Sequence, residues 1–340
     1  MPRPRTALAG SALLAMALGG TGCGSSGSPS AGQAGPPSAP SHTATTAKPQ
    51  LRGVSVTTAG SLPSGLADAA LARLADGRLV LLGGVNESGS STAAITVLAG
   101  SGVSRHDALP APQHDAEAAA LGSSVYVFGG GDVSSYSHIL GYHPASGHVS
   151  TAGALPSPAS DVAVAVIGDT AYVVGGYDGT RWLDTILAWK PGSAVRVVGR
   201  LPVGLRYAAV AAAGSRLIVA GGRTTTGVTD AIFRFDPTTG KVVRIGRLPF
   251  GLAHASAAAI GAWVLVAGGR LQPDGDRTPA ILAINPESGA VQRVGQLPQA
   301  LSDAAVASTG RIVLLVGGET SAGPQSTILA LTPRLTAGRP

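Results

Sequence analysis

Six polar or aromatic residues recur along the chain at spacings of 46 to 49 positions, each just before an alanine-rich or apolar segment. They are Asp68, Asp115, Asp161, Tyr207, His254 and Asp303. Four carboxylates brought together could hold a cation or an amino group, because hard cations prefer oxygen ligands. The alternative is structural, since an aspartate at a turn accepts hydrogen bonds from the backbone. Both interpretations stay open at the level of the sequence.

Three residues break the repeated aspartate pattern. Tyr207 and His254 stand where the other units have aspartate, and Arg206 precedes Tyr207. A specific ligand requires such asymmetry, and a histidine can act as a general acid or base near neutral pH. The structural alternative is that His254 is an ordinary surface histidine. No residue is assigned as catalytic or as a metal ligand, and no cofactor is expected.

A second candidate site is a variable polar loop that holds Arg181 and Trp182. Binding commonly occurs on loops of this kind, because a rigid scaffold positions them. Trp182 could stack on a sugar or on a protein partner, or it could pack against a neighbouring repeat. These two residues complete the candidate set for ligand binding.

The elements that position these residues follow from an internal repeat. Apolar runs end in Gly-Gly six times, and the second glycines of these pairs lie 46, 46, 46, 47 and 49 residues apart, at Gly84, Gly130, Gly176, Gly222, Gly269 and Gly318. A Leu-Pro pair recurs with a similar spacing, from 62–63 to 297–298. Because two independent markers agree, the period is a property of the fold.

Each unit is predicted to form four short strands, which in the fourth unit span 208–213, 216–220, 231–235 and 242–247. The first strand is rich in alanine, as a narrow centre requires, and the second is apolar on both faces. The sequence therefore predicts an all-β fold, a six-bladed β-propeller of four-stranded blades over residues 51–335. The last unit lacks its fourth strand, so residues 54–58 are expected to pair with the C-terminal blade and close the ring.

The segment GGYDGTRWLDTILAWKP, from 175 to 191, resembles a Kelch repeat, and the other five units follow its spacing. The aromatic position of that repeat is occupied by Leu98, Tyr142, Trp189, Phe235, Ile284 and Leu331. Some exported bacterial Kelch propellers, such as the sialic acid epimerases, act on sugars at the central opening. The resemblance thus implies an alternative function, a carbohydrate-active enzyme (sugar epimerase or mutarotase-like) in which Arg206, Tyr207 and His254 would carry the reaction.

Galactose oxidase also contains Kelch repeats, and its radical cofactor requires a cysteine crosslinked to a tyrosine. The one cysteine of the present chain is Cys23, which precedes the predicted propeller. That chemistry is therefore not expected here.

The N-terminal sequence is typical of a bacterial lipoprotein signal peptide. Residues 1–22 carry two arginines, a short apolar run and small residues, in the order of a secretory signal peptide. Gly20-Thr-Gly-Cys23 resembles a lipobox, so Cys23 is expected to carry the lipid anchor. Residues 24–50 lack large apolar side chains and are expected to form a disordered tether, and residues 336–340 a short tail.

Together these features predict a surface-anchored, extracytoplasmic lipoprotein that acts as a non-enzymatic binding module. Its partner would be an extracytoplasmic protein or a carbohydrate, and the membrane would be contacted through the lipid alone. The net charge of +6 includes no basic cluster in the mature chain, so nucleic acid is not expected as a partner. We expect a monomer.

Overall fold

The computed structural model describes residues 50–336, apart from residues 101 and 272–274. These residues belong to one compact unit, which spans Thr46–Pro340. The predicted signal peptide, Cys23 and nearly all of the tether lie outside the described residues. Within the described part of the chain, no helix is long and apolar enough to qualify as a membrane span.

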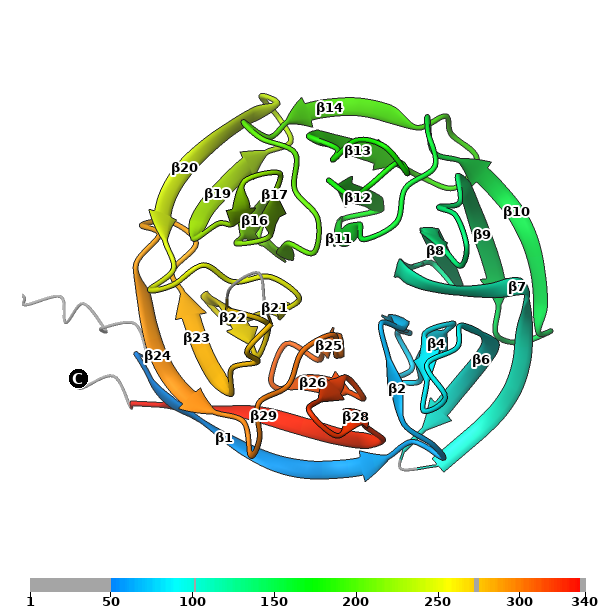
Figure 1. Cartoon of the computed structure of the whole chain (residues 1–340), viewed down its shortest axis with the longest axis horizontal. Helices are drawn as coiled ribbons and strands as arrows, with labels where there is room; N and C mark the ends of the chain where they lie inside the picture. Colours follow the sequence, from blue (N-terminus) through cyan, green and yellow to red (C-terminus); the bar gives the residue numbers. More distant parts are fainter. Residues whose placement is uncertain (1–49, 101, 272–274, 337–340) are drawn as a thin grey trace, which may run out of the picture. The chain divides into compact units, whose positions relative to one another are not determined.

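Four separate four-stranded antiparallel sheets stand around a central opening (Figure 1). The first is β11 (Ala163–Ile167), β12 (Thr170–Val174), β13 (Thr185–Trp189) and β14 (Arg196–Arg200); the second is β15 (Ala209–Ala213), β16 (Arg216–Ala220), β19 (Ala231–Asp236) and β20 (Lys241–Arg247). The third is β21 (Ser256–Ile260), β22 (Trp263–Ala267), β23 (Ala280–Ile284) and β24 (Val291–Gln296). The fourth has the order β1 (Leu51–Ser61), β29 (Thr327–Leu335), β26 (Val313–Val316), β25 (Ala305–Ser308).

The remaining blade strands form one seven-stranded sheet. Its strands are β3 (Ala70–Arg73), β4 (Leu79–Leu82), β6 (Thr92–Ala99), β7 (Gly102–Leu121), β8 (Ser124–Gly131), β9 (His138–His143) and β10 (His148–Ala154). The long strand β7 pairs with β6 up to Gln113 and with β8 from His114 onward, so it is the outer strand of one four-stranded group and the inner strand of the next. The propeller class is confirmed, whereas four separate blades stand where six were predicted, because β7 joins the other two groups.

Closure of the ring by the N-terminal strand is confirmed. β1 pairs antiparallel with β29 from Leu51↔Leu335 to Ser61↔Thr327, over a longer span than the predicted 54–58. This pairing supplies the fourth strand that the last repeat lacks, and it covers an edge that would otherwise expose unpaired peptide groups.

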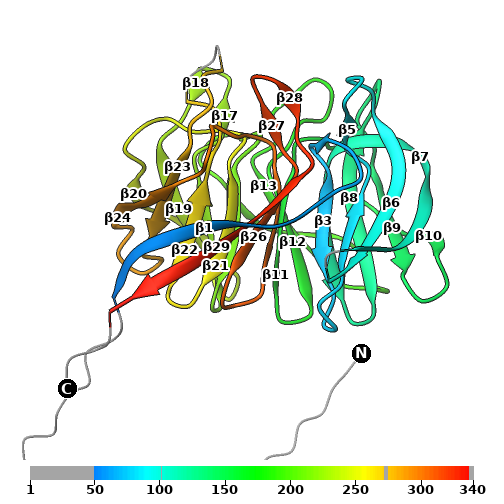
Figure 2. The ribbon, with the colours of Figure 1, turned by 90° about the horizontal axis from the view of Figure 1, so that it is seen from below.

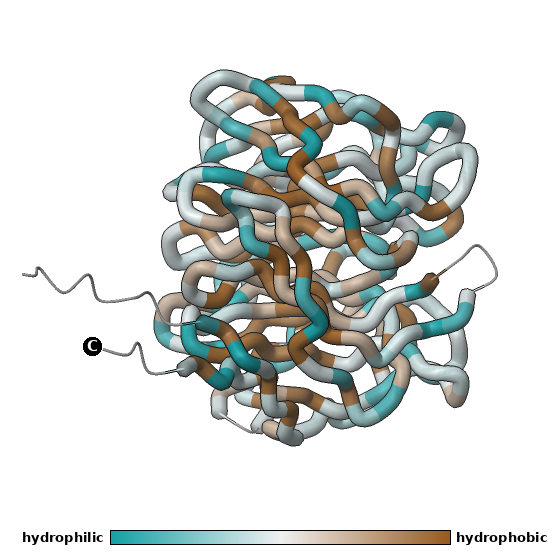
Figure 3. Tube along the Cα trace, turned by 90° about the vertical axis from the view of Figure 1, so that its left-hand side faces the viewer, coloured by the Kyte–Doolittle hydropathy of each residue, from teal (hydrophilic) through white to brown (hydrophobic). Residues whose placement is uncertain are grey.

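The core lies between neighbouring four-stranded groups. Six clusters of buried apolar residues are present in the described part of the chain, and each joins two adjacent four-stranded groups around the circle. Apolar residues accordingly concentrate along the strands and polar ones at the turns (Figure 3). Because each group packs on both of its neighbours, the innermost strands are held at fixed positions around the axis.

One face of the ring carries short additional hairpins. β17 (Arg223–Thr224) pairs with β18 (Gly227–Val228), and β27 (Glu319–Thr320) with β28 (Gly323–Pro324), at the same face as the β2 (Leu66–Ala67) to β5 (Val85–Asn86) pair (Figure 2). Single bridges such as Arg206↔Arg223 and Ser302↔Glu319 tie these loops to the segments that enter the innermost strands. We call this side of the ring the loop face.

Candidate functional site

The six recurring residues form a ring around the axis at the loop face, and all six have a left-handed backbone, with φ between 50° and 58°. Among the described residues, no other non-glycine residue has a positive φ. Aspartate tolerates this conformation better than most residues do, which explains why it fills four of the six positions. Tyrosine and histidine adopt it at a cost, so Tyr207 and His254 are strained exceptions.

The backbone of these residues forms a closed circle of hydrogen bonds. The N–H of each one donates to the carbonyl oxygen of its counterpart in the preceding unit, at 2.9–3.2 Å, and the circle ends where Asp68 donates to Asp303. In the described hydrogen bonds no backbone N–H donates to the four carboxylates, contrary to the structural role that the sequence suggested. The turn uses the peptide groups, so the side chains are left to interact with other side chains at the mouth of the central channel.

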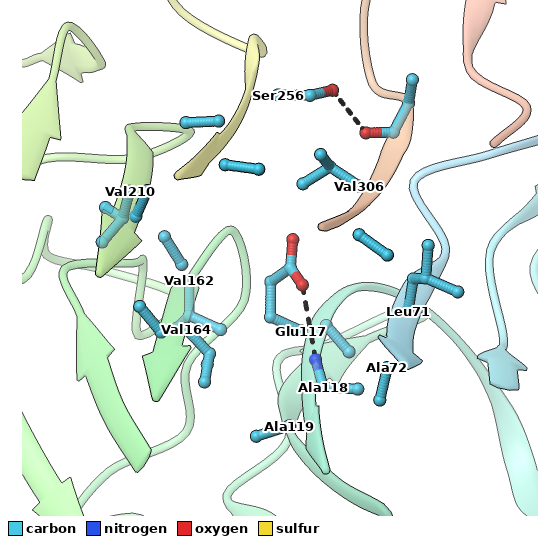
Figure 4. Close-up of a pocket in the computed structure, with 18 of the residues that line it drawn as sticks. Leu71, Ala72, Glu117, Ala118, Ala119, Val162, Val164, Val210, Ser256 and Val306 are labelled. Carbon is cyan, nitrogen blue, oxygen red and sulfur yellow. Dashed lines mark hydrogen bonds between the residues drawn. The ribbon is translucent and has the colours of Figure 1, made fainter. Parts of the chain in front are cut away.

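A cavity of about 430 Å³ follows the axis between the innermost strands, and the six ring residues form its mouth. Its walls are mainly alanine and valine, among them Ala118, Val162 and Val210 (Figure 4). The six innermost strands converge on the axis, and large side chains on them would fill the space between them. The small side chains leave it open.

Glu117 is the acidic side chain on the cavity wall below the ring, and Figure 4 shows its carboxylate directed into the cavity. Its hydrogen bond from the backbone N–H of Ala118 is long, at 3.4 Å. Burial deep inside the ring raises the pKa of the carboxyl from 4.5 to about 8, and the Ala118 N–H lowers it slightly. Sequence analysis missed this residue, although a lone glutamate within an alanine run was the available signal.

At one side of the mouth, Asp303 is fully engaged. Its carboxylate lies 2.5 Å from Nδ1 of His254 and accepts hydrogen bonds from Ser302 Oγ at 2.6 Å and Arg270 Nη2 at 2.7 Å. Burial acts to raise its pKa, but the bond and charge of His254, followed by the charge of Arg270, hold the pKa well below its usual range. Asp303 is therefore an ionised anchor for His254 and Arg270, the latter shared with Glu319.

At the opposite side, Asp161 pairs with the guanidinium of Arg206. That guanidinium lies over the rings of Tyr177 and Trp182, 4.4 Å and 5.4 Å from their centroids, so Trp182 contributes to the site through Arg206. The Asp161 side chain is 1% exposed, and its second oxygen, Oδ1, has no hydrogen-bond partner.

Two aromatic rings connect these sides. Tyr207 stacks on His254 with ring centroids 3.6 Å apart and an interplanar angle of 22°. The Tyr207 hydroxyl lies 3.3 Å from Oδ2 of Asp115, to which it donates. The stack forms one wall of the mouth.

The middle of the carboxylate set, Asp68 and Asp115, has no guanidinium partner among the described ion pairs, although His114 Nε2 lies 3.5 Å from Asp115 Oδ2. Burial raises the pKa of Asp68 well above its ordinary value, and the charges of Asp303 and Asp115 add to this effect. Burial and the charge of Asp161 do the same for Asp115. Both shifts favour the protonated form, so this half of the mouth holds crowded carboxyl groups whose ionisation a bound cation would favour.

Seven of the nine candidate residues lie directly at the mouth. Trp182 lies beside one of them, Arg206. Arg181 is the exception, because its side chain is 81% exposed and pairs with Asp178 within its own loop. Asp68, His254 and Asp303 place possible ligand atoms within 4.8 Å of one another, which makes them the group among the described residues that could hold a metal ion.

Comparison with known proteins supports the fold. Residues 158–194 match the Kelch motif model, which confirms the resemblance seen at 175–191. A solved structure titled "Structure of YjhT" superposes with a TM-score of 0.69 at 18% sequence identity, covering 81% of this chain and 99% of that one. No curated protein matches the chain. At this level of identity the similarity concerns the fold alone.

Proposed function

We propose that the protein is an exported, lipid-anchored binding module that holds its ligand at the mouth of the central channel. A Kelch-type propeller supports a binding or interaction module in general. The observation that carries the specific proposal is the mouth itself, where Arg206, the Tyr207–His254 stack and Asp303 line one side of an open cavity and the carboxyl groups of Asp68 and Asp115 line the other. Such a combination of open space and converging polar groups is typical of a ligand site.

The direction of the chain supports the anchored arrangement. The N-terminal end of β1 lies toward the face opposite the loop face (Figure 2). A tether that enters from that side would present the mouth away from the lipid. Labelling of cells with a fatty-acid analogue tests the anchor: labelling should be lost in Cys23→Ser, and equal labelling of both proteins would refute it.

The binding site is tested by thermal shift of the purified protein against neutral, amino and acidic sugars, because a ligand that binds the folded state alone raises its stability by mass action. A ligand at 100 times its dissociation constant should add about 2.7 kcal/mol. The shift should be lost in Arg206→Ala and kept in Arg181→Ala, which changes an arginine of the neighbouring loop. A shift that survives Arg206→Ala would place the ligand elsewhere.

A second candidate is a carbohydrate-active enzyme. One observation favours it: the carboxylate of Asp303 holds Nδ1 of His254 at 2.5 Å, an arrangement that orients a histidine for proton transfer through its other nitrogen. Turnover of a sugar that is lost in His254→Ala would establish this function. Binding of the same sugar without turnover would favour the non-enzymatic binding module.

A further inference from the structure

We propose that the axial cavity takes a linear aliphatic diammonium ion, with one ammonium group among Asp68 and Asp115 at the mouth and the other beside Glu117 within the channel. This inference rests on the proposed binding site and specifies the chemistry of its ligand.

The crowding of carboxyl groups at the mouth favours a cation. Four carboxylates meet there, and the described guanidinium groups that pair with them, Arg206 and Arg270, bind the outer two, Asp161 and Asp303. The backbone N–H groups of the ring are all donated to carbonyl oxygens, so they offer nothing to an anion. An acidic sugar would therefore meet arginines that are already paired and crowded carboxyl groups, whereas an ammonium group would favour the ionised forms of Asp68 and Asp115 and bind to them directly.

Glu117 provides the second, independent indication. It lies deep in the ring, and its carboxylate is directed into the cavity with a single long bond from the backbone (Figure 4). Ionisation of a buried carboxyl without strong partners is costly, so the group stays protonated unless a cation accompanies it, and an ammonium ion beside it would favour the ionised form. An ammonium group offers three N–H donors at this point.

The spacing and the walls define the rest of the ligand. Glu117 follows Asp115 by two residues in β7, and two strand residues advance the chain by about 7 Å. The nitrogens of an extended 1,4-diaminobutane lie roughly 6 Å apart by standard bond lengths. Alanine and valine side chains line the channel between these acidic groups, so a methylene chain would be buried against apolar surface.

A metal ion at the mouth would account for fewer features of the cavity than a diammonium ion would. Divalent cations could use the mouth carboxylates, but neither the apolar walls nor Glu117, one level deeper, contributes to such a site. A diammonium ion uses both levels and the surface between them. A lysine side chain carries one ammonium group and could occupy one level alone, so a lysine derivative tests whether the second ammonium contributes.

The test is titration calorimetry of the purified full-length protein with 1,4-diaminobutane, 1-aminobutane, an N-acetylated lysine amide and calcium chloride, each alone. We expect 1,4-diaminobutane to bind at least tenfold more tightly than 1-aminobutane. Glu117→Gln should reduce this advantage to less than threefold, and Asp115→Asn should weaken both amines. Equal affinity for the lysine amide and the diamine would overturn the inference, because the second ammonium group would then contribute nothing.

Unchanged diamine binding in Glu117→Gln would overturn the inference, as would calcium binding that excludes the diamine. Ser256→Ala is the matched control, because Ser256 stands two residues after His254 as Glu117 stands two after Asp115. This variant should bind the diamine like the wild type. If no amine binds but a sugar produces a shift that depends on Arg206, the diammonium inference fails while the proposed binding site stands.

Discussion

Replacing Glu117 by glutamine should stabilise the propeller at neutral pH and flatten its pH dependence. Burial raises the pKa of the Glu117 carboxyl from 4.5 to about 8. Between these values the folded protein keeps a proton that the unfolded chain releases. A group that binds more protons in the folded state loses stability as the pH rises, so Glu117 contributes a loss from about pH 4.5 that is complete above about pH 8.

The size of this loss follows from the pKa difference. At 1.36 kcal/mol for each pKa unit, the cost of Glu117 at pH 7 would be about 3 kcal/mol. Water that reaches the carboxylate from the cavity screens its charge, which reduces the expected cost to about 2 kcal/mol. Glutamine preserves the shape and remains neutral at every pH, so it should recover this amount.

Urea denaturation of both proteins at pH 5, 7 and 9 measures the effect. The stability of the wild type relative to Glu117→Gln should fall by about 2.5 kcal/mol between pH 5 and pH 9. Asp68 and Asp115, whose pKa values are also raised, affect both proteins alike and cancel in the difference. Ser256→Ala should keep the wild-type pH profile. Parallel profiles of wild type and Glu117→Gln would refute the argument that the folded cavity keeps Glu117 protonated.

Three further outcomes test the packing of the ring. Gly221→Ala should reduce the free energy of unfolding, measured by urea denaturation, by more than about 3 kcal/mol, because a β-carbon there would collide with the carbonyl oxygen of Leu252. Gly214→Ala, with a similar φ and open space around it, should reduce it by about 1 kcal/mol. Equal losses would contradict the collision. Deletion of β1 should lower the thermal midpoint sharply or abolish soluble folding, and an unchanged midpoint in differential scanning calorimetry would refute closure through this strand. Tyr142→Phe should cost about 1–2 kcal/mol in the same urea assay, because the buried hydroxyl donates to Asp107 at 2.6 Å, and no loss would mean that this bond contributes nothing net.

Much of the fold could be predicted from the sequence because each strand depends on short-range signals. The predicted strands 208–213, 216–220, 231–235 and 242–247 correspond to β15, β16, β19 and β20 within one residue at each end. The continuity of β7 from Gly102 to Leu121 was not predicted. Its Leu-Pro pair, Leu109-Pro110, is the same as in the other units, where it was expected to lie between two separate strands. Whether such a segment continues the strand depends on pairing between Gln113 and Thr92, which is a property of the folded sheet.

The positions of the site residues were predictable, whereas their partners were not. Regular spacing and a closed ring suffice to place Asp68 and its five counterparts around one axis. That Arg206 is neutralised by Asp161, while Asp115 has no such partner, depends on side-chain contacts between different blades. Glu117 was missed because alanine-rich strands were interpreted as filling of a narrow centre, and a single acid within one of them was not examined as an exception.

The asymmetry of the mouth has an energetic basis in the ring positions themselves. A left-handed backbone costs an ordinary L-residue about 1–2 kcal/mol, and aspartate less. Tyr207 and His254 accept this cost at adjacent positions, where their stacked rings, 3.6 Å apart, offset part of it. The six equivalent positions therefore divide into an aromatic side, fixed by stacking and ion pairs, and an acidic side whose carboxyl groups have no guanidinium partner among the described ion pairs. A ligand that enters along the axis meets different chemistry on each side, so a nearly symmetric scaffold can hold it in a single orientation.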